Sequence, residues 1–324
     1  MNLDALRERA RIVSAIRRFF DGLGFLEVET PVRIAAPAPE EHIDCPPVVD
    51  GGYLRASPEL QMKKLLAAGL DKIYEIGPCF REGENGSRHN PEFTMIEWYR
   101  RDATYLDIKD DLERLLASLS VSRLLPQAFP GEGRETEDER RGFVTLRVRD
   151  AYLEYAGWDP WAGEWNQDRF DFDMATKIEP AIKALGGGVF LMDYPPQAAS
   201  LAKLSFDHHS PRTSHQAPGT SHQAPGTSHQ APSTPYAERW EFYWDGLELA
   251  NCFTELCDGE EQTRRFEKAK AARRELGEAD YPIDREFLAE LPKIGRAAGV
   301  ALGVDRLVMV LTGLKDIHQV RVAD

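Results

Sequence analysis

The sequence contains no run of 18 or more apolar residues, and this absence excludes a membrane-spanning helix. Its charged N-terminus lacks the apolar core of a signal peptide. Only four cysteines occur, and their positions fit neither a zinc site nor a thioredoxin motif, so we expect reduced thiols and a cytoplasmic location. Hydrophobic residues make up 42% of the 324, which is enough for one large domain or two modest ones.

Positive charge is also scarce. The chain has 40 Lys and Arg against 54 Asp and Glu, a formal net charge of −14, and no lysine-rich stripe is interleaved with aromatic residues. A protein that grips tRNA normally presents a basic face, because phosphate neutralisation dominates its affinity. The composition therefore argues against nucleic-acid binding, without excluding a local basic patch.

The most informative stretch is residues 80–99, F-R-E-G-E-N-G-S-R-H-N-P-E-F-T-M-I-E-W-Y. Segments 72–76 and 93–99 alternate between apolar and polar residues, and the loop between them has turn residues, which predicts a β-hairpin. Its tip carries charges of both signs: Arg81, Glu82, Glu84, Arg88 and His89. Guanidinium groups bind phosphate oxygens, and carboxylates hold Mg²⁺ or amines, so the tip suits a polyanion; a merely solvated tip is the alternative.

A second hairpin is predicted over residues 239–253, around an Asp-Gly turn. Strict alternation would put Glu248 and Asn251 on opposite faces of the returning strand, provided that no bulge intervenes. A carboxylate between apolar strand neighbours is costly without a cation. Glu241, Glu248 and Glu255 therefore indicate Mg²⁺ or an ammonium group, unless this is an edge hairpin with a solvated face.

We expect further regular elements along the chain: a helix over residues 4–20, strands over 25–31 and 53–56, a helix over 104–119 and a strand over 189–195. Ser57, Pro58 and Glu59 predict a helix start, as N-cap, first position and acidic first turn. A small helical insertion is expected at about 143–188. The repeated T-S-H-Q-A-P-G predicts a disordered loop at about 210–235, because this composition cannot bury a core.

Residues 80–99 resemble motif 2 of the class II aminoacyl-tRNA synthetases, in its lysyl version. G-V-A-L-G-V-D-R-L at 299–307 resembles motif 3, a glycine-rich strand that runs into a helix. The helix, strand and proline over residues 4–31 resemble motif 1, the dimer element, and so imply a homodimer. The resemblance implies an α+β fold, with a mixed, mainly antiparallel sheet flanked by helices, in one catalytic domain over residues 1–324.

E-L-A-N-C-F-T-E-L at 248–256 resembles the lysyl-enzyme motif E-x-x-N-G-F-x-E-L. Lysyl-tRNA synthetases carry an anticodon-binding domain before the motif 1 helix, whereas here that helix opens the sequence. The chain therefore looks like their truncated paralogues, the elongation factor P–(R)-β-lysine ligases, without an anticodon-binding domain. That family implies ATP-dependent activation of (R)-β-lysine or lysine and transfer to a lysine of elongation factor P, and does not favour tRNA as a partner.

The resemblance also implies roles for individual residues. Arg81 and Arg306 are the expected catalytic residues: Arg81 would hold the α-phosphate and the substrate carboxylate, and Arg306 would stack on the adenine opposite Phe93. ATP is expected to contact Arg81, Glu82, Gly83, Glu84, His89, Asn90, Phe93, Glu248, Leu249, Gly303 and Arg306, with Mg²⁺ on Glu241 and Glu248. The amino acid is expected to contact Ser57, Pro58, Glu59, Glu97, Tyr99, Asn251, Glu255 and Ala301. No general base is needed, because the attacking carboxylate is ionised at pH 7.

The sequence departs from the family pattern in three places. The usual F-R-x-E is shifted, so either Glu82 or Glu84 takes the motif 2 role, and we favour Glu84. Cys252 replaces a common glycine, and Ala301 stands where the synthetases tend to have glycine; its methyl group is expected to reshape the pocket for a β-amino acid. The alternatives are a free-standing adenylate former that charges tRNA or another carrier, and an inactive regulator, against which the intact candidate residues argue.

Overall fold

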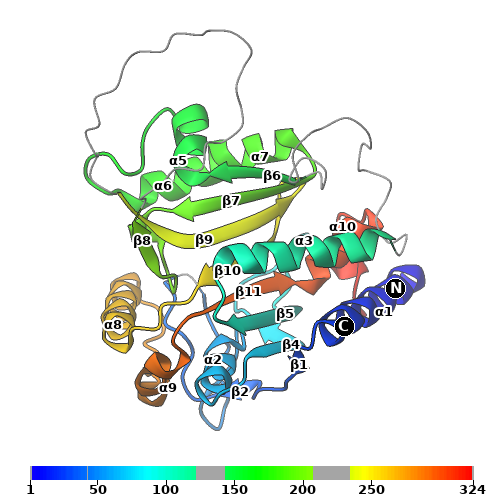
Figure 1. Ribbon diagram of the computed structural model, residues 1–324, viewed down its shortest axis with the longest axis horizontal. Coiled ribbons are helices and arrows are strands. Elements are labelled where there is room, and N and C mark those ends of the chain that lie inside the picture. Colours follow the sequence, from blue (N-terminus) through cyan, green and yellow to red (C-terminus); the bar gives the residue numbers. More distant parts are fainter. Residues whose placement is uncertain (1, 42, 122–142, 207–233, 323–324) are drawn as a thin grey trace.

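The computed structural model describes residues 2–41, 43–121, 143–206 and 234–322 (Figure 1). Within these ranges the main sheet has nine strands. In spatial order they are β1 (Leu26–Glu27), β4 (Lys72–Phe80), β5 (Glu92–Arg101), β11 (Ala297–Gly303), β10 (Leu247–Thr254), β9 (Pro235–Trp244), β7 (Gly188–Tyr194) and β6 (Phe143–Arg147), with β8 (Leu204–Phe206) beside β9. Only the β1–β4 and β6–β7 pairs are parallel. The expected α+β class with a mixed, mainly antiparallel sheet is confirmed.

Three helices cover one face of the central strands: α1 (Leu3–Gly22), α3 (Tyr105–Val121) and α10 (Val304–Thr312). They bury the side chains of Ile96 and Trp98 on that face, whereas Glu97 and Tyr99 point to the other face because side chains alternate along β5. The second face packs against α2 (Glu59–Ala67), α8 (Gly259–Leu276) and α9 (Arg285–Glu290). The central strands thus have one apolar side and one side on which polar groups can face a cavity.

Both predicted hairpins are present. β4 and β5 pair from Lys72↔Arg100 to Phe80↔Glu92, and β9 and β10 meet at the Asp245-Gly246 turn, where both residues have positive φ. The motif 3-like segment is a strand, β11, that runs directly into α10, as expected.

The predicted strand over residues 25–31 is mostly wrong. Only β1 pairs with β4, because Thr30 leaves the ladder and donates from its amide and its hydroxyl to the buried Glu75. The strand predicted over 53–56 shortens to β3 (Tyr53–Leu54), which pairs with β2 (Arg33–Ile34), because the guanidinium of Arg55 is buried 2.6 Å from Glu75. One buried carboxylate therefore sets the path of two segments.

Residues 148–185, between β6 and β7, are mainly helical. They form α5 (Val148–Ala151), α6 (Gln167–Asp173) and α7 (Glu179–Leu185), with π-helical turns η1 (Tyr152–Ala156) and η2 (Met174–Ile178). The stacked rings of Tyr152 and Phe170 lie in a separate core of this part. The flanking ends of the predicted insertion are the strands β6 and β7. The T-S-H-Q-A-P-G repeat lies outside the described residues.

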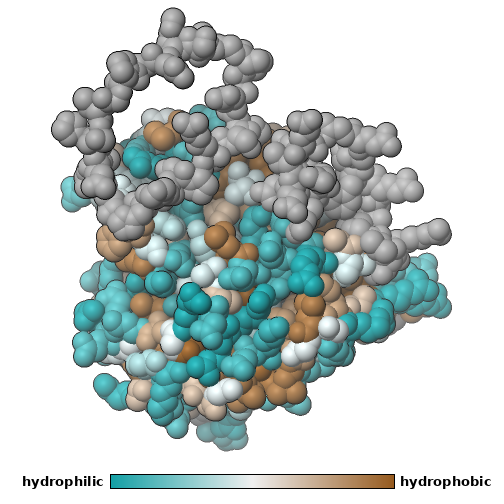
Figure 2. Space-filling model, in the orientation of Figure 1, coloured by the Kyte–Doolittle hydropathy of each residue, from teal (hydrophilic) through white to brown (hydrophobic). Residues whose placement is uncertain are grey.

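The surface in Figure 2 shows hydrophilic and hydrophobic side chains interspersed on this face of the described chain. No helix in the described ranges has the length and apolar character that a membrane crossing requires.

Candidate active site

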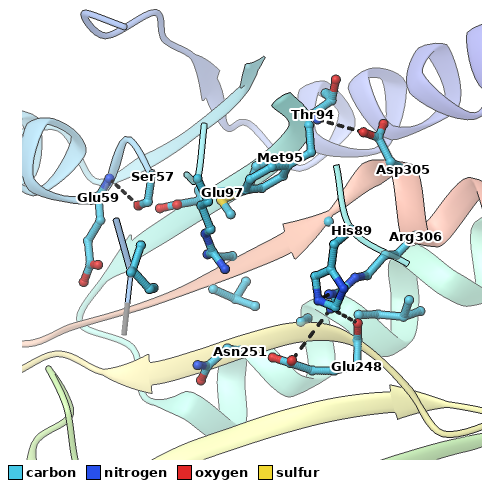
Figure 3. A pocket seen from close by; sticks show the side chains of 18 of the residues that line it. Ser57, Glu59, His89, Thr94, Met95, Glu97, Glu248, Asn251, Asp305 and Arg306 are labelled. Atoms are coloured by element: carbon cyan, nitrogen blue, oxygen red, sulfur yellow. Dashed lines mark hydrogen bonds and ion pairs between the residues drawn. The ribbon is translucent and has the colours of Figure 1, made fainter. Parts of the chain in front are cut away.

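A cavity of about 350 Å³ lies over strands β5, β11 and β10. Its floor includes three directly paired residues on neighbouring strands, Glu97, Ala301 and Asn251. Directly paired residues share a face of a sheet, so these side chains point into the same space. Figure 3 shows Glu59 and Glu97 on one side of the cavity, and His89, Glu248 and Arg306 on the other.

The cavity brings together most of the residues predicted from the sequence. They come from the start of α2, the hairpin tip, β5, β10, β11 and the start of α10: Ser57, Glu59, Arg81, Glu84, His89, Asn90, Phe93, Glu97, Tyr99, Glu248, Leu249, Asn251, Ala301, Gly303 and Arg306. The convergence of segments more than two hundred positions apart is what the resemblance to the synthetases requires.

Five predicted residues do not line the cavity: Glu82, Gly83, Pro58, Glu241 and Glu255. Glu82 and Gly83 are exposed at the hairpin tip, while Glu84 faces the cavity and lies 3.4 Å from Arg81. Pro58 is the N-cap of α2, which begins one residue later than expected, and the Ser57 hydroxyl accepts from the amide of Glu59 at 3.0 Å.

Glu241 and Glu255 are held by cations of the protein. Glu241 lies 2.5 Å from Arg239 and accepts from the Tyr243 hydroxyl at 2.6 Å. Glu255 forms a buried ion pair with Lys63, whose ammonium group also lies 2.6 Å from Glu59. Against the effect of burial, the charges of Glu255 and Glu59 raise the pKa of Lys63. Burial of the Glu255 carboxyl raises its pKa to about 7.

The alternation along β10, expected only in the absence of a bulge, is interrupted at one point. Glu248 opposes Tyr243 and Ala250 opposes Phe242, so Leu249 is an extra residue in a β-bulge. The bulge puts Glu248 and Asn251 on the same face, three residues apart. Although 41% of the Glu248 side chain is exposed, its enclosure in the cavity wall and the charge of Glu241 raise its pKa to about 7.

Arginines dominate the end of the cavity near the hairpin tip. The guanidinium of Arg81 lies 5.2 Å from the centre of the Phe93 ring, and its Nε has no hydrogen-bond partner among the described residues. One face of Phe93 is therefore covered by Arg81, an arrangement that the sequence did not suggest. Arg306 donates to the carbonyl of Glu248 at 2.8 Å and meets Nε2 of His89 at 2.7 Å. Partial burial and the charge of Arg306 lower the pKa of His89, which favours a neutral, accepting imidazole.

Carboxylates dominate the opposite end. The Glu97 side chain is 1% exposed; its Oε2 accepts from the Tyr99 hydroxyl at 2.9 Å, and its Oε1 has no hydrogen-bond partner in the described part of the chain. Burial, and then the charge of Glu59, raise the pKa of Glu97 to about 8. The Tyr99 ring lies directly over Gly299, where an added Cβ would come within 2.1 Å of ring carbons. This end is thus a buried, acidic pocket with an unsatisfied oxygen.

Some lining residues were not singled out from the sequence as site residues: Glu40, Ile43, Thr94, Met95, Ala250, Phe253, Gly299, Val300, Asp305 and Ile317. Asp305 could have been found, because the D-R pair of motif 3 suggests a partner role. It is 1% exposed, and it accepts from the amide of Thr94 at 3.0 Å and from Arg9. Glu40 lies within a proline-rich stretch without periodicity, which carries no such signal.

The two ends suit different ligands. The unpartnered Arg81 Nε and the nearby Arg88 and Arg306 fit the phosphates of a nucleotide. Glu248 offers an accessible carboxylate for Mg²⁺, which usually takes one or two protein carboxylates together with substrate phosphates. No cluster of three or more metal-ligating side chains occurs among the described residues.

Comparison with known proteins identifies the family of the chain. The family model for class II tRNA synthetases (D, K and N) matches residues 2–322. The chain is 37% identical to an elongation factor P–(R)-β-lysine ligase of Proteus mirabilis, over 97% of this chain and 93% of the relative. The corresponding ligases of Yersinia enterocolitica and Vibrio parahaemolyticus are 34% and 33% identical, over 97% and 98% of this chain and 93% and 95% of each relative. The chain therefore belongs to the class II tRNA synthetases of the D, K and N group, in the family of the elongation factor P–(R)-β-lysine ligases.

Proposed function

We propose that this protein is an ATP-dependent ligase that activates (R)-β-lysine, or lysine, as an aminoacyl-adenylate and transfers it to a lysine side chain of elongation factor P. The names of its relatives support this function. The observation that carries it is one cavity with an arginine-rich end and a buried acidic end. An amino acid with an extra amine, joined to a nucleotide, has matching charges at its two ends.

The activation step needs positioning more than covalent chemistry. Arg81 would hold the substrate carboxylate against the α-phosphate and stabilise the charge that develops there. Arg306, fixed by the carbonyl of Glu248, would bind the nucleotide beside it. Glu248 would hold Mg²⁺, which supplies positive charge next to the phosphates when bound. Glu241 would join it only after leaving Arg239.

Selection of the amino acid would occur at the acidic end. A neutral side chain would leave the free oxygen of Glu97 without a partner, whereas an ammonium group would donate to that oxygen and pair with the ionised carboxylate. Ala301 lies between Glu97 and Asn251 in the floor, so its methyl group would shape the space beside the amine. Ala301→Gly is expected to change the preference between (R)-β-lysine and α-lysine in a binding comparison, and an unchanged preference would retire this role.

We further propose that the protein works as a homodimer through the motif 1-like α1 and β1, and in the cytoplasm, where its four free cysteines would stay reduced. The elongation factor would approach the open, arginine-rich end of the cavity, where the adenylate forms.

Two assays test the function in sequence. Exchange of labelled pyrophosphate into ATP should depend on (R)-β-lysine or lysine and should be absent with norleucine. Radiolabel from (R)-β-lysine should then pass to purified elongation factor P and not to tRNA. Exchange without transfer to the factor, but with charging of tRNA, would favour the free-standing adenylate former. No exchange with any diamino acid would overturn the proposal.

A further inference from the structure

Glu40 reaches the cavity from a segment that carries none of the synthetase-like motifs. It lies in the irregular stretch between β2 and β3, and it lines the same cavity as Glu59 and Glu97. Its carboxylate makes no hydrogen bond or ion pair with any described residue, although its backbone amide donates to the Ala38 carbonyl at 2.9 Å. Enclosure and the charge of Glu59 raise the pKa of Glu40, while the charge of Arg81 acts in the opposite direction.

The position of Glu40 is set by a buried arginine of α8. Arg273 is 0% exposed and donates to the carbonyls of Glu40 at 2.8 Å and Ile43 at 3.2 Å, and to the carboxylate of Asp44 at 2.5 Å. Its guanidinium lies 4.4 Å from the centre of the Tyr281 ring. A buried guanidinium that satisfies three acceptors of one loop holds that loop in a defined place.

The same loop is fastened to the hairpin tip. The amide of Glu82 donates to the carbonyl of Asp44 at 2.8 Å, directly after Arg81 in the chain. The loop that carries Glu40 therefore lies against the end of the strand that carries Arg81, and the charge of Arg81 acts on Glu40, whereas Glu97 lies in the strand floor and accepts from the Tyr99 hydroxyl.

At the acidic end four carboxylates face one described cation. Lys63 serves both Glu59 and Glu255, and no described cation pairs with Glu40 or Glu97. A diamino acid brings two ammonium groups, one near its carboxylate and one at its far end. If Arg81 holds the carboxylate, the nearer ammonium group falls beside Glu40 and the farther one beside Glu97.

We propose that Glu40 is a further specificity-determining residue, whose carboxylate binds the ammonium group nearer to the carboxylate of the diamino acid, while Glu97 binds the terminal one. This inference rests on the proposed function, because it takes the cavity to be the amino acid site. Recognition of the ammonium group nearer to the carboxylate would then depend on the loop that Arg273 holds in place.

The test compares Glu40→Gln with Glu41→Gln, a neighbouring carboxylate that does not line the cavity. The probes are (R)-β-lysine (3,6-diaminohexanoate) and 6-aminohexanoate, which lacks only the nearer amine. Binding is measured by calorimetry without ATP, and activation by pyrophosphate exchange. Glu40→Gln should weaken binding of (R)-β-lysine about tenfold or more and leave 6-aminohexanoate within about twofold, because only the first loses a charge-assisted contact. Glu41→Gln should change neither.

Glu97→Gln provides the reciprocal variant, since it should weaken binding of 6-aminohexanoate and leave binding of 3-aminohexanoate, which lacks the terminal amine, unchanged. An equal loss for both probes in Glu40→Gln, or no loss for either, would overturn the assignment of Glu40, as would a wild-type protein that binds neither. Melting temperatures establish that each variant is folded. Selective binding without pyrophosphate exchange in the wild type would support the role of Glu40 and count against the proposed activation.

Discussion

The two ends of the cavity achieve charge in different ways. At the arginine-rich end the side chains are partly exposed, with 26% of Arg81 and 22% of Arg306 accessible, and they contact carbonyls, a ring and a neutral imidazole. At the acidic end the side chains of Glu59 and Glu97 are buried, and burial raises the pKa of Glu97 to about 8. Guanidinium groups stay protonated whatever their surroundings, so the arginines keep their charge, whereas the carboxyl groups of Glu97 and Glu248, with pKa values raised to about 8 and about 7, change their charge near neutral pH.

This difference separates two tasks. An end that carries arginines and is accessible to water can bind the phosphates of a nucleotide and release them again. A buried end whose charge is completed by the ligand rejects substrates that cannot supply an ammonium group, because unpaired burial is costly. We expect changes to the arginines to alter the rate, and changes at the acidic end to alter selectivity.

The largest effect is expected for Arg81→Lys. A lysine cannot reproduce the planar, bidentate contact of a guanidinium, so the exchange rate should fall by about 10² to 10³. The free energy of unfolding should change little. Arg7→Lys, at an exposed surface ion pair, serves as the control. A higher KM for the amino acid with an unchanged rate would indicate that Arg81 acts in substrate binding and not at the reacting phosphate.

Substitutions of the two carboxylates expected to bind Mg²⁺, Glu248 and Glu241, should have different effects. Glu248→Gln should raise the Mg²⁺ concentration needed for exchange by about tenfold, since it removes an accessible ligand. Glu241→Gln should instead lower the free energy of unfolding by about 3 kcal/mol, because it leaves the mostly buried Arg239 unpaired. Mg²⁺ titrations and denaturant unfolding of both variants measure this. The reverse pattern would show that Glu241 leaves Arg239 to bind the metal.

The close approach of the Tyr99 ring to Gly299 allows the acidic end to be changed without altering a carboxylate. Gly299→Ala should displace the Tyr99 ring and lower the free energy of unfolding by about 1 to 3 kcal/mol. KM for the diamino acid should rise while KM for ATP stays constant. Gly22→Ala, which meets no atom within 4 Å, should be neutral. A rise in KM for ATP as well would mean that the two ends are not independent.

The most gradual effect is a dependence of the free energy of unfolding on pH. The folded protein keeps a proton on Glu97 up to about pH 8, whereas the unfolded chain loses it near the ordinary value of 4.5. Stability should therefore fall as pH rises between these values, by at most about 1.4 kcal/mol per pH unit for this group. Denaturant unfolding of wild type and Glu97→Gln across this range should show a flatter profile for the variant. Parallel profiles would mean that Glu97 is already ionised below neutral pH.

Much of this site was visible in short patterns. The alternating residues on either side of the hairpin tip predicted β4 and β5, and the Asp-Gly turn predicted the β9–β10 hairpin. Arg81, Glu97 and Arg306 converge in one cavity, as the order of the synthetase-like motifs implies. Local alternation could not reveal the bulge at Leu249, because a bulge exists only relative to the partner strand β9.

Turn chemistry, strand alternation and helical spacing act over a few residues, so the chain alone was enough for the hairpins and for the strand that leads into α10. Which carboxylates meet a ligand was settled by packing between distant segments. Lys63 pairs with Glu255, and Arg239 pairs with Glu241. Arg273 donates to the carbonyl of Glu40 and so holds its loop, although the two residues are more than two hundred positions apart in the sequence. A buried carboxylate is available to substrate only if no protein cation reaches it, and that depends on the folded arrangement of the whole chain.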